Sequence, residues 1–485
     1  MAAAIASLSY VFWCVGAMEM IERLAYYGVR TVSGLYAKAP ASEGGLGITP
    51  SQLGTIYFFW AIAQNAVSAL TGGMADRYGY KRMIGISTAV KIAGYLTMAA
   101  LPSYGGFAAG AILLAVGTAI FKPALQGTLV QSTNRKNSSL AWGVFYQTVN
   151  IGGFIGPLVA GYMRKMDWRY VFLTNAGVIC LNFLMLLAYR EPRGAGGEAP
   201  TEGARRPSLL RESLGELGRP HVFVYLIIFS GFWFMFYGFF DLLPLHVDDW
   251  IDTRPVVATL FGPDGTQNPV AKFFFILNKT GTEMQPEGVV DLNSLLIMTV
   301  CFVVAALTAK LRATVSIFLG TALAALAFIL FGATVTGWLV VMGVFLFSLG
   351  EMLSSPKFLE YIGNFAPRDK KAMYLGFAQI PIMVGMMLEG KIGPVLYDHF
   401  ASKERFAREL LMERGQTAQA VALIPQGEAF GRLVEQTHLD RWQVTANLAA
   451  RHPIGVPWTM MALIGFVAAV AMLFYGRWVA KRTTA

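Results

Sequence analysis

The stretch EMIERLAYYGVR, residues 19–30, places charged side chains inside a long apolar run. The run extends over residues 8–36. It is longer than the stretch of about 20 residues that a helix needs to cross a hydrocarbon core of roughly 30 Å. A charge at mid-membrane costs at least about 2.5 kcal/mol, so it normally faces a cavity or a partner. At about 100° per residue, six polar side chains share one helical face: Glu19, Glu22, Arg23, Tyr26, Tyr27 and Arg30. This face predicts a water-filled pathway, with a buried structural ion network as the alternative.

The composition places the whole chain in a membrane. Of its 485 residues 55% are hydrophobic and 14% are charged, whereas soluble domains carry about 25% charged residues. This excludes a soluble enzyme and a disordered protein, and the continuous apolar runs exclude a β-barrel with its short alternating strands. We therefore predict an all-α membrane protein with 12 transmembrane helices in two six-helix halves. The expected spans are 8–36, 48–75, 82–101, 106–131, 140–163, 169–189, 221–249, 291–309, 313–332, 336–364, 372–397 and 455–478.

The formal net charge of +10 predicts topology more than a nucleic-acid partner. Basic clusters lie in short loops after even-numbered spans, and cationic loops stay on the cytoplasmic side. These clusters are Asp76–Arg82, Asn134–Lys136, Lys310–Arg312, Arg368–Lys371 and Lys481–Arg482. The loop with Arg164, Lys165 and Arg169 opposes this bias. We expect both termini in the cytoplasm, a bacterial inner (plasma) membrane as the location, and a lipid bilayer with no nucleic acid as the partner.

A polar segment divides the chain into two halves. Residues 191–220 are rich in Gly, Pro and charge and end in the amphipathic SLLRESLGEL, which predicts a cytoplasmic linker with a short helix. The expected domains are an N-terminal six-helix bundle at 1–190 and a C-terminal bundle at 221–485. Two halves of this kind place a midplane site between parts that rock. The long outer loops 250–290 and 398–454 are expected to form caps, with a gate or a partner contact as the alternative.

Further polar groups within spans complete the candidate site. Lys122 stands beside Pro123, Tyr146 and Asn150 lie in the fifth span, Asn293 begins the eighth, and Glu351 lies in the tenth. Cations thus concentrate in the first half and a carboxylate lies in the second, which fits a zwitterionic solute. Glu351 could instead be protonated and hydrogen-bonded within its bundle.

Other ionisable groups have weaker patterns. Lys91 either snorkels or pairs across helices. Asp241 and His246 lie toward the outer end of the seventh span and are expected at the interface, with a gate as the alternative. No metal spacing, phosphate loop or nucleophile–base set stands out. We expect neither an enzyme nor a cofactor other than the coupling proton.

Two motifs carry a family resemblance. GGMADRYGYKR at residues 72–82 resembles the cytoplasmic loop signature of the major facilitator superfamily, in which glycines allow a tight turn. ExxER…YYGxR at residues 19–30 resembles the first-helix motif of the proton-dependent oligopeptide transporter (POT) family. Three stretches agree with it in the expected order: Phe121-Lys122-Pro123, Phe145–Gly152, and Gly350-Glu351…Ser355-Pro356.

The resemblance implies a monomeric proton-coupled symporter that imports di- or tripeptides, or a related small zwitterionic or carboxylate-bearing solute, by alternating access. The implied proton-coupling residues are Glu19, Glu22, Arg23 and Lys122. The implied substrate-binding residues are Tyr26, Tyr27, Arg30, Lys122, Tyr146, Asn150, Asn293 and Glu351. The implied inner-gate loop consists of Gly73, Asp76, Arg77, Gly79 and Arg82.

The chain also departs from the family pattern. In span 11 the family has a Trp soon after a Gly, whereas this chain reads YLGFAQ at residues 374–379. Before the loop signature the family has a Pro, whereas this chain reads AVSALTGG. The tryptophan pattern of span 7 is unclear in FSGFWFMFYGFFD, and the linker is too short for two extra helices. The sequence therefore retains the residues implied in proton coupling, and it departs from the family where the pocket for substrate side chains is expected. The alternatives are a proton-coupled exporter of drugs or anions with the same fold, and a membrane sensor or assembly partner that does not transport.

Overall fold

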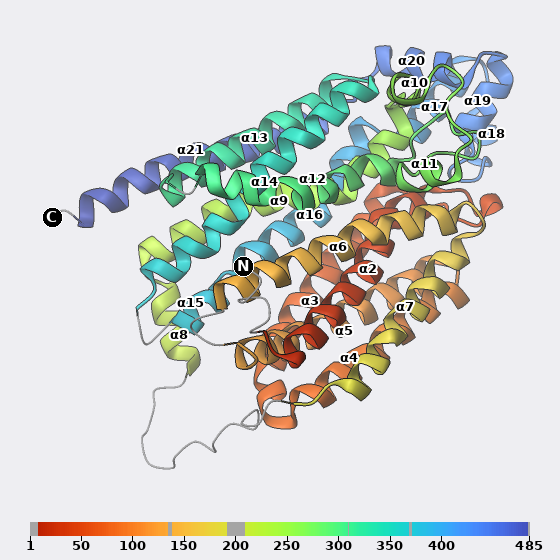
Figure 1. The fold of residues 1–485 in the computed structure, drawn as a ribbon. Coiled ribbons are helices and arrows are strands. Elements are labelled where there is room, and N and C mark those ends of the chain that lie inside the picture. Colours follow the sequence, from red (N-terminus) through yellow and green to blue (C-terminus); the bar gives the residue numbers. More distant parts are fainter. Residues whose placement is uncertain (1–7, 134–137, 192–208, 309, 368–370, 484–485) are drawn as a thin grey trace. The chain divides into compact units, whose positions relative to one another are not determined.

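The computed structural model describes residues 8–483 except 134–137, 192–208, 309 and 368–370. The described part is almost entirely helical, with one isolated β-bridge between Asp252 and Thr336 (Figure 1). The all-α fold class predicted from the sequence is confirmed. The chain divides into two compact units, and residues 192–208 of the expected linker lie outside the described residues.

Unit 1 comprises residues 1–48, 59–202 and 267–281. Helix α2 packs against α6 and α7, and α4 packs against α5 and α7. The first of these helices begins after Ser9, whose Oγ accepts a hydrogen bond from the Phe12 N–H at 3.2 Å and so satisfies a free helix-end donor. The helices are α2 (Tyr10–Lys38), η1 (Ala41–Glu43), α4 (Tyr80–Ala100), α5 (Tyr104–Gln131), α6 (Ser138–Arg164), α7 (Trp168–Ala188) and α11 (Pro269–Phe274).

Glycines bring α2 and α6 into close contact. A Cβ atom on Gly152 would lie 2.4 Å from the Met20 carbonyl oxygen, and one on Gly156 would lie 2.4 Å from that of Leu24. Both distances are too short for a methyl group, so only glycine permits this spacing. These glycines of the stretch IGGFIG, residues 151–156, hold the charged part of α2 close to its neighbour.

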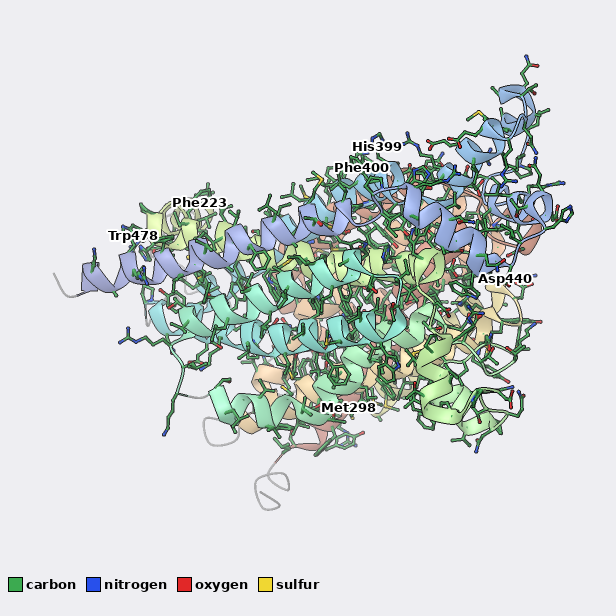
Figure 2. The ribbon with its side chains drawn as sticks, turned by 90° about the horizontal axis from the view of Figure 1, so that it is seen from above. Phe223, Met298, His399, Phe400, Asp440 and Trp478 are labelled. Carbon is green, nitrogen blue, oxygen red and sulfur yellow. The ribbon has the colours of Figure 1, made fainter. Side chains whose placement is uncertain are left out.

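Unit 2 comprises residues 49–58, 203–266 and 282–485. In it α13 packs against α14 and α21, and α9 packs against α16 and α21. Figure 2 shows Phe223 of α9 and Trp478 of α21 at the same end, and the Tyr475 hydroxyl donates to the His221 carbonyl at 3.0 Å. The long helices are α9 (Pro220–Trp250), α12 (Pro286–Thr308), α13 (Ala313–Ala333), α14 (Gly337–Phe365), α16 (Gln379–Phe400) and α21 (Val456–Thr483). The shorter α8 (Leu209–Leu217), α10 (Arg254–Phe261) and α15 (Lys371–Phe377) also belong to it.

The span expected over 372–397 is interrupted. Helix α15 ends at Phe377 and α16 begins at Gln379, with Ala378 as a turn between them. Pro381 has no N–H to donate to the carbonyl four residues earlier, that of Phe377, so the helical ladder loses a bond there. The interruption falls in the YLGFAQ stretch that departs from the family pattern.

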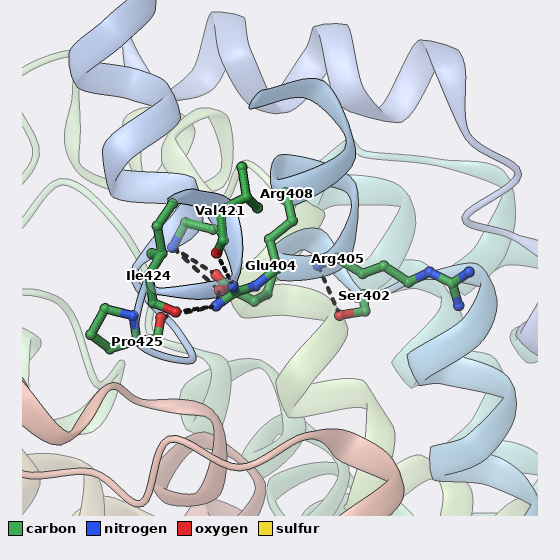
Figure 3. Close-up of polar contacts among 8 residues, drawn as sticks. Ser402, Glu404, Arg405, Arg408, Val421, Ile424 and Pro425 are labelled. Carbon is green, nitrogen blue, oxygen red and sulfur yellow. Dashed lines mark hydrogen bonds and ion pairs between the residues drawn. The ribbon is translucent and has the colours of Figure 1, made fainter. Parts of the chain in front are cut away.

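The outer loop after α16 forms a small helical cap. Its helices are α17 (Lys403–Glu413), α18 (Ala418–Ala422), α19 (Ala429–Thr437) and α20 (Arg441–Arg451). Phe406, Leu411, Leu433 and Leu448 are buried, which explains the helical apolar spacing of this loop. Arg408 joins its parts by donating to the carbonyl oxygens of Val421, Ile424 and Pro425 (Figure 3).

The other outer loop is shared between the units. Residues 254–261 form α10 in unit 2, where Asp252 bridges to Thr336. Residues 267–281 belong to unit 1, where Lys165 donates to the Leu277 carbonyl and Tyr162 packs edge-on against Phe273 at 6.3 Å. The helix α3 (Pro50–Tyr78) is also divided, because its residues up to 58 group with unit 2.

Within the described residues, nine helices are long and apolar enough to cross a membrane. The three other expected spans correspond to α2, α3 and α6, which have 29, 29 and 27 residues. At about 1.5 Å per residue, each is longer than a hydrocarbon core of roughly 30 Å. The count of twelve transmembrane helices stays a prediction.

Candidate functional site

The polar face of α2 forms a buried ion network. Glu19, Glu22 and Arg23 are 6%, 1% and 6% exposed. Arg23 Nε lies 3.2 Å from Glu19 Oε1, and Arg23 Nη2 pairs with Glu22 Oε2. One guanidinium therefore serves two carboxylates, an arrangement that its fork of donors permits. The structure brings together three of the four residues to which the sequence assigned proton coupling.

A lysine from another helix completes the network. Lys91 on α4 is 1% exposed, and its Nζ lies 3.5 Å from Glu22 Oε1. The Thr118 hydroxyl on α5 donates to the same oxygen at 3.2 Å. Of the two interpretations of Lys91 from the sequence, pairing across helices is correct. Thr118 was missed because a threonine in an apolar helix gives no signal of its own.

Lys122, the fourth residue assigned to coupling, lies one turn beyond Thr118 on α5 and is partly exposed. Among the ion pairs of the described residues, none includes Lys122. Lys91, and not Lys122, is the lysine that pairs with Glu22 among the described residues. The proposed roles of Lys122 in coupling and substrate binding stay predictions.

Aromatic rings surround the cations of α2. The Arg23 guanidinium carbon lies 4.9 Å from the Tyr26 ring centre and 6.0 Å from that of Tyr27. Arg30, 2% exposed, lies 4.9 Å from the ring centre of Trp60 on α3. Rings attract cations through their negative faces. Trp60 was missed from the sequence because tryptophan is ordinary in an apolar run.

The fifth expected span corresponds to α6 and holds two of the candidate substrate-binding residues. Tyr146 and Asn150 lie on α6 and are partly exposed. The Asn150 amide donates to the carbonyl of Tyr146 at 2.8 Å, which is a bond within its own helix. This bond uses one of the two N–H donors of the amide, and the substrate role of both residues stays a prediction.

Unit 2 contains a separate polar cluster. Asn293 on α12 donates to Ser348 Oγ at 3.0 Å and to Glu351 Oε2 at 3.1 Å, both on α14. All three side chains are buried, at 2%, 0% and 7% exposure. The structure therefore brings Asn293 and Glu351 together, and Glu351 is hydrogen-bonded within its own bundle. Ser348 lies close to one turn before Glu351 and was not identified from the sequence.

Glu351 is not the only buried carboxylate of unit 2. Asp241, Asp249, Glu287, Asp291 and Glu389 are all at most 4% exposed. His246 is fully buried, and its Nε2 donates to the Phe331 carbonyl at 3.0 Å. Helix packing covers both Asp241 and His246, and their position at the outer interface stays a prediction.

The loop signature at residues 72–82 forms the turn that its glycines predict. Helix α3 ends at Tyr78, Gly79 has a φ of 91°, and α4 begins at Tyr80. The Glu191 carboxylate accepts the Tyr80 N–H at 2.6 Å, a favourable place for a negative charge at a helix start.

The other residues of this signature make few contacts that the structure describes. Arg77 lies over the Tyr78 ring at 5.7 Å, and Arg82 is exposed. Gly73 and the side chain of Asp76 lie outside what the structure describes. A role for this loop in the inner gate stays a prediction.

Comparisons with known proteins agree with this architecture. The model of the Major Facilitator Superfamily matches residues 23–388. The peptide transporter YePEPT of Yersinia enterocolitica is 30% identical over 162 residues, which cover 32% of this chain and 31% of that protein. The multidrug resistance protein MdtH of Aeromonas salmonicida is 21% identical over 202 residues, 41% of this chain and 49% of that protein. The chain thus spans about a third to a half of the length of such curated relatives.

Solved structures share the fold over nearly the whole length. A POT family transporter in complex with a thioalcohol-conjugated peptide has a TM-score of 0.68 at 15% identity, covering 98% of this chain and 99% of its own. The nucleoside transporter NupG also has a TM-score of 0.68, at 11% identity, covering 96% and 99%. These similarities show the fold and no substrate, and the neighbours are transporters and not enzymes. The chain belongs to the Major Facilitator Superfamily, and its similarities are consistent with a divergent member of the peptide-transporter family within it.

Proposed function

We propose that the chain is a proton-coupled symporter of a bacterial inner membrane that imports di- or tripeptides, or a related small zwitterion, by alternating access. The observation that carries this proposal is the buried network on α2, in which Arg23 is shared by Glu19 and Glu22. Two turns further along the same helix is Arg30, a buried cation suited to a substrate carboxylate.

Sharing one guanidinium between two carboxylates supplies a coupling mechanism. Protonation of either carboxylate removes one of the two charges that hold Arg23. Arg23 is then held by one carboxylate instead of two, and its weaker compensation in a low-dielectric site has a cost in free energy. Rearrangement of α2, or binding of a substrate carboxylate, relieves this cost. The protonation state and the conformation of the transporter are coupled in this way.

The cluster in unit 2 supports a zwitterionic substrate. Glu351 Oε2 accepts a hydrogen bond from the Asn293 amide. The ammonium group of a substrate is a suitable additional partner for this carboxylate. A POT family transporter with the same fold was solved in complex with 5-aminolevulinic acid, which bears both an amine and a carboxylate. The departures from the family pattern in spans 7 and 11 are the reason to include such solutes beside peptides.

Reconstituted protein tests the proposal. Proteoliposomes with an inward proton gradient are given a panel of dipeptides, tripeptides, amino acids and 5-aminolevulinic acid. We expect at least one of them to accumulate in wild type, and Glu22→Gln and Lys122→Ala to abolish accumulation while counterflow exchange partly survives. Proton-driven accumulation by both variants would contradict the coupling mechanism.

Export of drugs or anions is a second candidate function. It is favoured by the similarity to MdtH and to the methyl viologen resistance protein SmvA of Salmonella typhimurium. The direction of substrate-induced proton flux separates the two candidates. Protons that enter with the substrate support the symporter, and protons that leave as the substrate enters support the exporter.

A further inference from the structure

Lys91 is a buried cation on α4, and the coupling mechanism proposed above gives it no role. Its Nζ lies 3.5 Å from Glu22 Oε1 and 3.8 Å from the centre of the Phe121 ring. The ring face attracts the ammonium, and the carboxylate compensates its charge. Two contacts of different chemistry therefore fix the end of this side chain.

Gly117 of α5 leaves space for the stem of Lys91. A Cβ atom on Gly117 of α5 would lie 2.4 Å from Lys91 Cγ, so any side chain at that position would collide with the stem. Ser87, one turn before Lys91, donates to the Gly117 carbonyl at 2.7 Å. This bond holds α4 and α5 together where the lysine passes. The contact between Lys91 and Glu22 thus depends on the space that Gly117 leaves between α4 and α5.

The two carboxylates of the network differ in their partners. Glu22 Oε1 has Lys91 and Thr118, and its Oε2 has Arg23. Among the ion pairs of the described residues, Glu19 pairs with Arg23 alone. If Arg23 moves, Glu22 keeps an ion-pair partner on α4 and a hydrogen-bond partner on α5, whereas Glu19 loses its ion pair. Glu19 and Arg23 are therefore the exchangeable part of the network.

Charge balance supports the same division. Two carboxylates, Glu19 and Glu22, face two cations, Arg23 and Lys91, so both carboxylates can be ionised without a contribution from Lys122. Removing one member of a buried pair leaves an uncompensated charge, which is strongly destabilising.

We propose that Lys91 is a positioning residue that holds the Glu22 carboxylate in place when Arg23 leaves it during coupling. Glu22, Lys91 and Thr118 form the fixed part of the network, and Glu19 and Arg23 form the part that changes. This inference rests on the proposed function, since it assigns Lys91 to a step of that mechanism.

The test compares Lys91→Gln, Lys91→Arg and the control Lys279→Gln with wild type in proteoliposomes. Lys279 is an exposed lysine of the outer loop. We expect Lys91→Gln to lower proton-driven accumulation at least roughly tenfold, because Glu22 loses an ion-pair partner in a buried site, while counterflow exchange persists. Lys91→Arg should restore part of the accumulation, and Lys279→Gln should match wild type. A merely structural role would reduce accumulation and exchange together.

A double variant separates misfolding of Lys91→Gln from loss of the proposed positioning role. If Lys91→Gln loses both activities, exchange is measured for Glu22→Gln/Lys91→Gln, in which two neutral amides replace the ion pair. Recovered exchange supports the proposal, because it shows that Lys91 acts through Glu22, and continued loss overturns it. Full accumulation by Lys91→Gln also overturns it. If wild type accumulates no member of the panel, the proposed function fails first, and this inference fails with it.

Discussion

A carboxylate buried among helices needs a donor, and for Glu351 that donor is the Asn293 amide at 3.1 Å. If this oxygen also receives a substrate ammonium, Glu351→Ala removes a charge-assisted hydrogen bond worth about 1.5–3 kcal/mol. We therefore predict a roughly tenfold or larger rise in KM for amino-bearing solutes and a smaller effect on N-acetylated ones. Uptake kinetics of each peptide and its acetylated form measure the difference.

A matched control lies on the same helix. Glu360 on α14 is half-exposed and pairs with Lys357 at 2.8 Å, so Glu360→Ala should leave both KM values near those of wild type. Equal loss of affinity for free and acetylated solutes in Glu351→Ala would remove its role as receiver of the amine.

At the scale of the element, the spacing between α2 and α6 depends on glycine. Gly152→Ala would place a methyl group 2.4 Å from the Met20 carbonyl oxygen and 2.8 Å from Arg23 Cβ. Since backbone cannot move aside easily, we predict a loss of about 1–3 kcal/mol of stability, seen as a lower apparent melting temperature of the purified protein. Gly177→Ala on α7 is the control, because no atom lies within 4 Å of a Cβ there. Unchanged melting of Gly152→Ala would mean that the helices separate freely.

The outer cap depends on one arginine. Arg408 Nη2 lies 2.7 Å from Glu404 Oε1 and also donates to the Ile424 and Pro425 carbonyls, both at 3.0 Å (Figure 3). Arg408→Met removes these bonds, so we predict local opening and faster protease cleavage within residues 421–428. Arg414→Met, at an exposed position of the same cap, should be cleaved at the wild-type rate. Equal rates for both variants would show that apolar packing alone closes the cap.

At the scale of the whole molecule, the charge distribution predicts the orientation in the membrane. Single cysteines are placed at exposed Lys310 and Arg432 after Cys14, Cys180 and Cys301 are replaced by Ala. Because cationic loops stay in the cytoplasm, an impermeant thiol reagent should label Lys310→Cys in inverted vesicles and Arg432→Cys in right-side-out vesicles. Labelling of both from one side would refute the predicted twelve-span topology.

Much of the fold could be predicted because membranes impose simple rules on sequence. Apolar length predicts helices such as α13 and α21, and helical spacing predicts those of the cap. The interruption at Ala378 was missed, because the effect of Pro381 on the ladder is a matter of backbone geometry. The sharing of the loop 250–290 between two units was also missed, since composition does not say which partner a polar loop will contact.

The candidate site shows the same division between local and distant information. The sequence by itself determined that Glu19, Glu22 and Arg23 share a face, because residues three and four apart on a helix are neighbours. Only the tertiary structure decided that Lys91 and Thr118 reach Glu22, that Trp60 covers Arg30, and that Asn293 meets Glu351. The physical reason is that contacts within one helix follow from its fixed period, whereas contacts between helices depend on how closely their backbones approach. A residue such as Gly117 controls that approach through the absence of a side chain, which no pattern of charge or hydropathy records.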